Sequence, residues 1–463
     1  MHESLVMSTF EKITVRAVTV HKSGIDVLSF LSSHIVQPSL VRYRRIQMKP
    51  VSQVAYLSEV ASLINSNNGK MLAKYIICRD PHVYNPRLAD PEPESVAMKH
   101  LTVPWDEAFS AHMRCIWAMR KQDFEEAYAC QVVVVKYPFH FIYRKVASYA
   151  NVGSMFNFVT TVARILTELK EENWVLPVVL ATAIDLRRFA HGLDTALSKS
   201  SSSTNRNHGR QMETAAQLIL RLFQLCASDS RTQLEDSKKL GMMGLANQLF
   251  KIYFQINKLN LCKSMIRAID NLNMNDRFSL AQRVTYCYYV GRKSMFDGNF
   301  VAADKSLSFA FERCLGSAWH NKRLILIYLI PVKMLLGVFP YASLLTKYNL
   351  NEFLGISEAV KAGNLQQMDS ELNKYESFFL SCGVYLILEK LKLITYRNLF
   401  KKVCAIMKTH LLPIDVFTAA LRLMGVDDID QDETECILAN LIYEVSFCLL
   451  SLYHCVAPHI VLI

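Results

Sequence analysis

The sequence lacks the short motifs around which most catalytic and cofactor sites are built. It has no GxxxxGKS/T or GxGxxG loop for phosphates, no GxSxG nucleophile turn and no HExxH metal pair. None of its 13 histidines belongs to an HxH pair, and isolated histidines are usually structural: His112, His191, His320 and His410. We therefore expect neither an enzymatic activity nor a cofactor or small-molecule substrate.

Metal-binding patterns are also missing, although the chain contains 12 cysteines. No two cysteines have CxxC spacing, and most are scattered through apolar helical patterns, as is typical of reduced cysteines in a cytosolic or nuclear protein. Asp428, Asp430 and Asp432 have the beginning of a calcium-loop pattern. That loop requires glycine at its sixth position and glutamate at its twelfth, where this chain has Glu433 and Ala439. We expect no metal site.

Glycine and proline are scarce, with 15 and 13 copies in 463 residues, whereas 51% of the residues are hydrophobic. This composition argues against a disordered chain and favours a large, helical core. The formal net charge of +11 favours an acidic partner such as nucleic acid, an acidic protein or a membrane surface. An ordinary basic protein is an equally good interpretation of the charge alone.

Helical hairpins account for most of the chain. Phe109, Met113 and Ile116 share one apolar stripe, which ends at a polar turn over residues 121–123 before a second stripe begins. From residue 212 to about residue 379 similar pairs follow almost without interruption, with turns at residues 297–299 and at Gly363. Each pair has an apolar face too large to bury alone, so the pattern predicts an all-α solenoid of TPR- or HEAT-like hairpins.

The same patterns suggest where the parts of the chain begin and end. We expect a poorly defined leader (1–85), N-terminal hairpins (86–211) with an atypical insert (137–160) and a Ser-rich loop (198–210), a helical-repeat part (212–380), a winged-helix part (381–443) and an atypical apolar tail (444–463).

Two apolar stretches resemble membrane segments. Leu324–Leu345 has Lys333 as its only charge, but Pro331 and Lys333 near its centre disfavour a spanning helix. Residues 446–463 contain no Lys, Arg, Asp or Glu, yet Tyr453 and His454 argue against an anchor. We expect a buried solenoid helix and an apolar end that packs on the last module or is an unusual terminus, without membrane contact.

The stretch from Leu386 to Tyr443 predicts three short helices, which is the pattern of a winged-helix module. Thr395 suits the cap of the first, whose apolar stripe contains Tyr396, Leu399, Phe400, Val403, Ile406 and Met407. Pro413 suits the start of the second helix, over residues 415–424. An acidic run over residues 427–433 precedes the third, over residues 435–443, where its charge complements the helix dipole.

The first of these helices is strongly basic. At 100° per residue, Arg397, Lys401 and Lys408 lie within about 40° of one another. Such clusters bind phosphates with little sequence preference, although basic residues also commonly do no more than solvate a helix face. The candidate RNA-binding residues are Lys390, Lys392, Arg397, Lys401, Lys402 and Lys408.

Several long segments carry a resemblance to a known family: LEDSKKLGMMGLANQLFKIYFQINKLNLCKSMIRAID, AQRVTYCYYVGRKSMFDGNF, NKRLILIYLIPVKMLLG, LILEKLKLITYRNLFKKV and ECILANLIY. They resemble PCI-domain proteins, the scaffold subunits of the proteasome lid, the signalosome and a translation initiation factor, and above all the PCI subunits of a nuclear messenger-RNA export complex. The resemblance covers roughly residues 80–135 and 166–443.

The resemblance implies a nuclear protein, associated with the nuclear pore, with the cytoplasm as a second location. It implies three partners: a large scaffold subunit of the germinal-centre-associated nuclear protein type, a small acidic subunit of the Sem/DSS type, and a nucleic acid, RNA or alternatively DNA. Candidate contacts for the protein partners are Arg292, Lys293, Lys322, Arg323 and Lys333, each of which also suits an ordinary surface or snorkelling residue.

The chain departs from the family over residues 1–80, over 137–160 and after Tyr443, where the family continues with a basic wing hairpin and this chain continues with EVSFCLLSLYHCVAPHIVLI. Loss of the wing removes basic groups and part of the sheet. Two functions therefore remain: an RNA-contacting adaptor in messenger-RNA export, and a purely structural subunit of a lid- or signalosome-like assembly without nucleic-acid contact.

Overall fold

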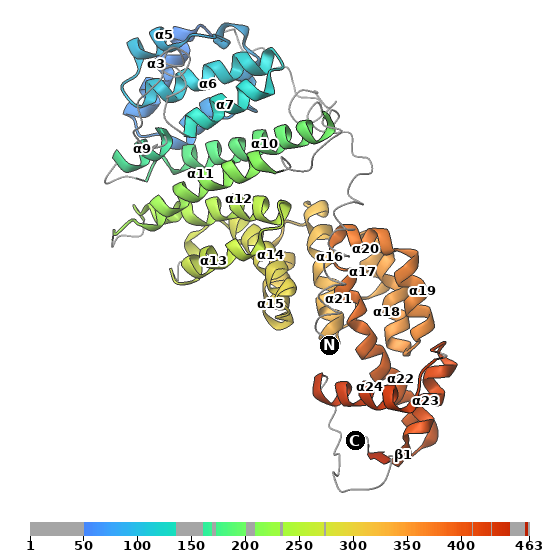
Figure 1. Cartoon of the computed structure of the whole chain (residues 1–463). Helices are drawn as coiled ribbons and strands as arrows, with labels where there is room; N and C mark the ends of the chain where they lie inside the picture. Colours follow the sequence, from blue (N-terminus) through green and yellow to red (C-terminus); the bar gives the residue numbers. More distant parts are fainter. Residues whose placement is uncertain are drawn as a thin grey trace, which may run out of the picture. The chain divides into compact units, whose positions relative to one another are not determined.

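A computed structural model of the chain shows two compact units, whose border falls between Tyr286 and Cys287. Each unit is predominantly helical (Figure 1), which confirms the predicted all-α class. The border lies inside a helix and not at residue 211, where the sequence suggested a division. The structure describes residues 51–135, 161–168, 173–200, 209–231, 235–272, 275–409, 411–426, 428–444 and 459–461.

The helices of the first unit form successive layers. They are α3 (Gln53–Asn65), α4 (Gly69–Ile76), α5 (Glu94–His100), α6 (Trp105–Arg120), α7 (Phe124–Val135), α9 (Thr161–Glu168), α10 (Leu176–Ser200), α11 (Arg210–Ala227), α12 (Met242–Gln255) and α13 (Cys262–Asp270). Short 3-10 turns join them: η2 (Pro81–Tyr84), η3 (Pro86–Leu88), η5 (Lys238–Gly241), η6 (Leu259–Leu261) and η7 (Asn275–Arg277).

The expected leader extends too far, because residues 51–85 already belong to the folded unit. The Ser52 hydroxyl caps α3 by accepting a 3.2 Å hydrogen bond from the Ala55 N–H. Leu57 and Val60 of α3 are buried, as is Leu72 of α4. The two helices are short and separated by Ser and Asn, so neither shows a repeat sustained over many turns in the sequence. Residues 1–50 of the expected leader lie outside the described residues.

The hairpin predicted around residues 121–123 is confirmed. Helix α6 ends at Arg120, Gln122 adopts a positive φ of 59°, and α7 begins at Phe124. The Ser-rich loop is shorter than predicted, because residues 198–200 extend α10 and Arg210 begins α11. Residues 201–208 of that loop and the predicted insert at 137–160 are outside the described part of the chain.

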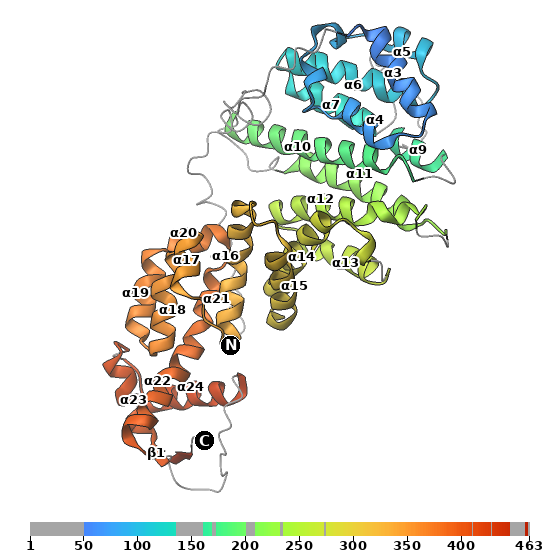
Figure 2. The ribbon, with the colours of Figure 1, turned by 180° about the vertical axis from the view of Figure 1, so that it is seen from behind.

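Helices α10 and α12 run parallel in neighbouring layers, with α11 packed against both (Figure 2). Along the contact, Gly241 lies beside Leu176, and Gly244 lies beside Leu180. From the first pair to the second, the residue number increases in both helices, which shows that the helices are parallel. Such an arrangement is typical of stacked helical repeats, in which equivalent helices of successive hairpins pack side by side.

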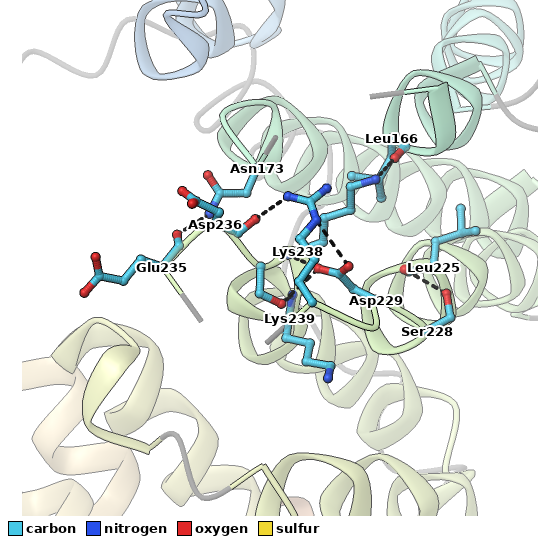
Figure 3. A network of polar contacts seen from close by, with 11 residues as sticks. Leu166, Asn173, Leu225, Ser228, Asp229, Glu235, Asp236, Lys238 and Lys239 are labelled. Atoms are coloured by element: carbon cyan, nitrogen blue, oxygen red, sulfur yellow. Dashed lines mark hydrogen bonds and ion pairs between the residues drawn. The ribbon is translucent and has the colours of Figure 1, made fainter. Parts of the chain in front are cut away.

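A polar network holds the ends of α9, α11 and η5 together (Figure 3). The Asp229 carboxylate accepts hydrogen bonds from the Ser237 hydroxyl (2.9 Å) and the Lys238 N–H (2.7 Å). Burial raises the pKa of Asp229, but these hydrogen bonds outweigh it and leave that pKa below its usual value. The ammonium group of Lys238 donates in turn to the carbonyl of Leu166. Asp229 and Lys238 together thus connect the three segments.

The second unit begins with hairpins and ends with a smaller module. In chain order it contains the end of α14 (Leu280–Phe296), then α15 (Phe300–Arg313), α16 (Trp319–Leu335), α17 (Ala342–Lys347), α18 (Glu352–Ala362), α19 (Leu365–Lys374), α20 (Glu376–Cys382), α21 (Tyr385–Glu389), α22 (Leu391–Met407), β1 (Leu411–Pro413), α23 (Ile414–Leu423), α24 (Gln431–Glu444) and β2 (His459–Val461).

Both glycine turns predicted in this unit are present. Gly298 (φ 80°) joins α14 to α15, and Gly363 (φ 66°) joins α18 to α19. The apolar stretch around Pro331 forms α16, most of whose residues are buried in the array. None of the helices in the described ranges combines the length and the apolarity that a bilayer crossing demands.

Gly363 should be much less tolerant of substitution than Gly298. A Cβ atom at Gly363 would lie 2.5 Å from the backbone N of Leu399 in α22, whereas one at Gly298 would meet nothing within 4 Å. We expect Gly298→Ala to lower the free energy of unfolding by about 1–2 kcal/mol through its positive φ. Gly363→Ala should cost roughly 1–3 kcal/mol more, because backbone must move. Urea denaturation of both variants measures the difference, and equal losses would contradict the packing argument.

Two histidines should make the first unit sensitive to acid. The Nε2 atoms of His82 and His112 lie 2.9 Å apart, an arrangement that requires at least one neutral ring. Burial lowers the pKa of His82 to about 4, and burial and His82 lower that of His112 well below its usual value. Since unfolding restores a pKa near 6.5, the unfolded chain binds more protons, and stability should fall as the pH drops from about 6.5 towards 4.

Denaturation of the wild type at pH 7 and pH 5 measures this loss. His82→Gln keeps a donor for His112 and does not titrate, so it should reduce the pH dependence. The exposed His320 of the second unit provides the control, since His320→Gln should leave the dependence unchanged. A His82→Gln protein with the full wild-type loss would exclude His82 as a cause.

Candidate functional site

The C-terminal module contains α22, α23 and α24, which lie together (Figure 1) and share an apolar core. The rings of Phe400 in α22 and Phe417 in α23 meet edge to face, with centroids 4.9 Å apart. Leu438 and Leu441 of α24 are buried in the same cluster. This core joins the basic helix to the two helices that follow it, so α22 is fixed in orientation when the module folds.

The predicted second and third helices are present, at slightly different positions. Pro413 precedes α23 at its cap position, as expected. Helix α24 begins four residues earlier than predicted, at Gln431, because Asp430 caps it by accepting a 2.7 Å hydrogen bond from the Glu433 N–H. Asp432 and Glu433 then lie in its first turn, where negative charge is favourable.

The C-terminal segment contributes to the module through a short strand. Strand β2 pairs antiparallel with β1, and Leu411, Leu412 and Pro413 face Val461, Ile460 and His459 in register. A strand is therefore present beside β1, although the sequence of the tail differs from that of the family's wing hairpin. Residues 445–458 lie outside the described part of the chain.

The start of α22 differs from the prediction. Thr395 does not cap the helix, which begins at Leu391; its buried hydroxyl donates instead to the Leu391 carbonyl at 2.9 Å. The predicted apolar stripe is also too long. Leu399 and Phe400 are buried, but Ile406 is 76% exposed because α22 extends beyond the core of the module.

The six candidate RNA-binding residues fall into two groups. Lys392 and Lys402 contact the helices that precede α22: the Lys392 ammonium lies 2.8 Å from an Asp369 carboxylate oxygen, and the Lys402 ammonium donates to the Ala362 carbonyl at 2.7 Å. Burial lowers the pKa of Lys392, but the hydrogen bond and the charge of Asp369 outweigh it and raise that pKa. These two lysines hold α22 to α18 and α19.

The other four lie along one side of α22. Lys401 and Lys408 are exposed, and Arg397 is half-buried. Lys390 is exposed at the cap position, with its ammonium 5.6 Å from the centroid of the Phe300 ring. By helical geometry these four positions fall within about 40° of each other around the axis. The structure thus brings together four of the six predicted residues.

The five cations predicted to bind protein partners all have contacts inside the second unit. Lys293 is only 3% exposed and is ion-paired with Asp297, so the prediction that it offers a surface charge is wrong. The Arg292 guanidinium lies 4.2 Å from the centroid of Tyr328, and the Lys333 ammonium is 3.0 Å from Asp304.

The last two candidates cap neighbouring segments. Lys322 donates to the carbonyl of Phe311 at 3.1 Å, and Arg323 donates to that of Asn349 at 3.3 Å. Four of these contacts join adjacent helices or loops of the hairpin array, and the contact of Lys293 lies at the end of its own helix. The sequence shows that these residues are basic. It does not show that each has a contact within the folded chain.

Exposed apolar residues at the ends of α22 and α23 were missed. Ile406 and Met407 were expected in the core, and Leu423 at the end of α23 is 81% exposed. For Ile406 and Met407, the sequence signal was the length of the apolar stripe predicted for this helix, which extends beyond the core of the module. These residues offer a surface suited to a protein partner.

Comparison with known proteins agrees with this geometry. The PCI domain model matches residues 372–445, which include α22, α23 and α24. PCI domain-containing protein 2 of Danio rerio is 47% identical over 388 residues, which are 84% of this chain and 90% of the relative. Its Drosophila melanogaster homologue is 43% identical over 391 residues, 84% of this chain and 91% of that relative.

More distant relatives carry other names. Protein CSN12 homolog of Gibberella zeae is 33% identical over 248 residues, which are 49% of this chain and 54% of the relative. The high identity over most of the chain, together with a helical solenoid that ends in a PCI module, shows that the chain belongs to the PCI domain-containing protein 2 family.

Proposed function

We propose that the chain is a non-enzymatic adaptor of a nuclear messenger-RNA export complex and contacts RNA phosphates through α22. The observation that carries this proposal is the side of α22 that presents Lys390, Arg397, Lys401 and Lys408. The opposite parts of the helix pack into the module and against α18. A rigid helix with aligned cations suits a polyanion better than a mobile basic tail, because less conformational freedom must be lost on binding.

The contact would be with the RNA backbone and not with particular bases. Lysine and arginine side chains follow phosphates without reading sequence. Sequence-specific recognition of single strands usually needs aromatic side chains on which bases stack. The aromatic rings of α22, Tyr396 and Phe400, are packed against its core.

The proposed complex also contains the large scaffold subunit and the small acidic subunit, and acts in the nucleus at the nuclear pore. Ile406, Met407 and Leu423 support a protein partner at the module, because exposed apolar side chains gain stability when covered. The five cations of the hairpin array are less suited to that role than the sequence suggested, since each already has an intramolecular contact.

A second function is a purely structural PCI subunit of a lid- or signalosome-like assembly. The observation that favours it is the same exposed apolar surface, which needs no nucleic acid. The two functions differ in one respect: only the adaptor depends on the charges of α22.

Reversal of two charges on α22 should weaken RNA binding without disturbing assembly. Lys401→Glu/Lys408→Glu changes exposed side chains and spares Lys402, which holds α18. The chain, co-expressed with both protein partners, would be titrated with single-stranded RNA between 50 and 200 mM salt. Because each phosphate contact contributes about 0.7 to the slope of log K against log salt, we expect that slope to fall by about 1.4 and affinity by roughly tenfold.

The matched control is Lys305→Glu/Arg313→Glu, which changes two exposed cations of α15 in the same unit by the same charge. It should reduce affinity far less. An assembled complex whose RNA affinity is the same for both variants would favour the structural subunit.

A further inference from the structure

A second group of cations lies in the first unit, on the parallel helices α10 and α12. Arg187 and Arg188 belong to α10, and Lys251 belongs to α12. The Arg187 Nε–H donates to Gln248, one turn before Lys251, at 3.0 Å. The two helices approach closely near their N-terminal ends, at Gly241 and Gly244. Further along, they bring these three cations together.

The charges around Lys251 are of its own sign. Burial, Arg187 and Arg188 together lower the pKa of Lys251 to about 8. Burial and the nearby Arg79 also lower the pKa of Arg188, and Asp185 opposes this effect. A half-buried group of like charges costs free energy in the isolated protein, and that cost is removed when an anion binds.

Asp185 is a buried counter-ion of Arg79. Its side chain is 3% exposed, and its carboxylate accepts a 2.8 Å hydrogen bond from the Cys78 N–H. It also lies 3.5 Å from the Arg79 Nε, whose side chain is 41% exposed. Arg79 thus extends the basic group beyond α4, so that the cations form a track over Arg79, Arg188, Arg187 and Lys251.

The track is polar where it follows α10 and α12. No large apolar side chain is exposed among the described side chains of α10 and α12. An acidic peptide that binds a helical scaffold usually gains much of its affinity from buried apolar anchors. A nucleic-acid backbone gains its affinity from phosphates, so the track suits it better.

From this arrangement we infer that Arg79, Arg187, Arg188 and Lys251 form a second site for the phosphates of single-stranded RNA. This inference rests on the proposed function, because it assumes that the chain binds RNA. The site uses none of the cations of α22 and lies in the other unit, so each site can be tested without the other.

The main test removes two charges from the track. In the assembled complex, Arg188→Gln/Lys251→Gln should weaken single-stranded RNA binding roughly tenfold at about 0.1 M salt, by the loss of two phosphate contacts. The control Lys263→Gln/Arg267→Gln removes the same charges from exposed positions of α13 in the same unit and should have little effect. The charge-preserving Arg188→Lys/Lys251→Arg should retain most of the affinity.

A second measurement uses the wild-type complex and does not depend on folding of a variant. An amine-acylating reagent should label Lys251, whose lowered pKa leaves more of the reactive neutral amine. RNA should protect Lys251 from acylation and leave Lys263 unprotected, as measured by mass spectrometry. Protection by polyglutamate but not by RNA would overturn the inference in favour of an acidic protein.

Combination with the α22 variant separates the two proposals. Loss of affinity in both double variants, with a larger loss when they are combined, supports two sites. If only Lys401→Glu/Lys408→Glu weakens binding, the site on α10 and α12 is wrong and the proposed function remains. If only Arg188→Gln/Lys251→Gln weakens binding, RNA binds this track and the role of α22 is wrong.

Discussion

The close approach of α18 to α22 at Gly363 is the constraint on which the second unit depends. Only a residue without a Cβ atom allows the end of α18 to lie against the backbone of α22. The Lys402 ammonium strengthens the same contact by donating to Ala362. Because α22 also shares its core with α23 and α24, this contact joins the hairpin array to the PCI module and determines which side of the basic helix faces outward.

Cations in this protein serve two different purposes. Lys333 and Lys392 are paired with acids and hold neighbouring helices together, and Lys293 is paired with Asp297 at the end of its own helix. Lys401 and Lys251 are held on helices, with no acid paired to them in the described part of the chain. The excess of positive charge over the whole chain therefore does not identify a binding site. The positions of the acids do, because they show which cations are already paired.

Several features were predictable because they depend on neighbours in the sequence. The hairpin turns at Gly298 and Gly363 follow from glycine at helix ends, and the three helices of the module follow from apolar spacing and polar breaks. Helices α3 and α4 were missed because short helices show no repeat sustained over many turns, and their stability comes from burial of Leu57 and Leu72. The cap assigned to Thr395 failed because packing carries α22 one turn further back.

The sequence by itself determined the helical class, the order of the hairpins and module, and the basic character of α22. These depend on composition and on spacings of a few residues. Only the tertiary structure decided which cations are available, since Lys392 is paired with an acid 23 residues away and Arg187 lies near Lys251 across two helices. Such pairs form between layers, and the distance between layers is set by packing and not by sequence separation.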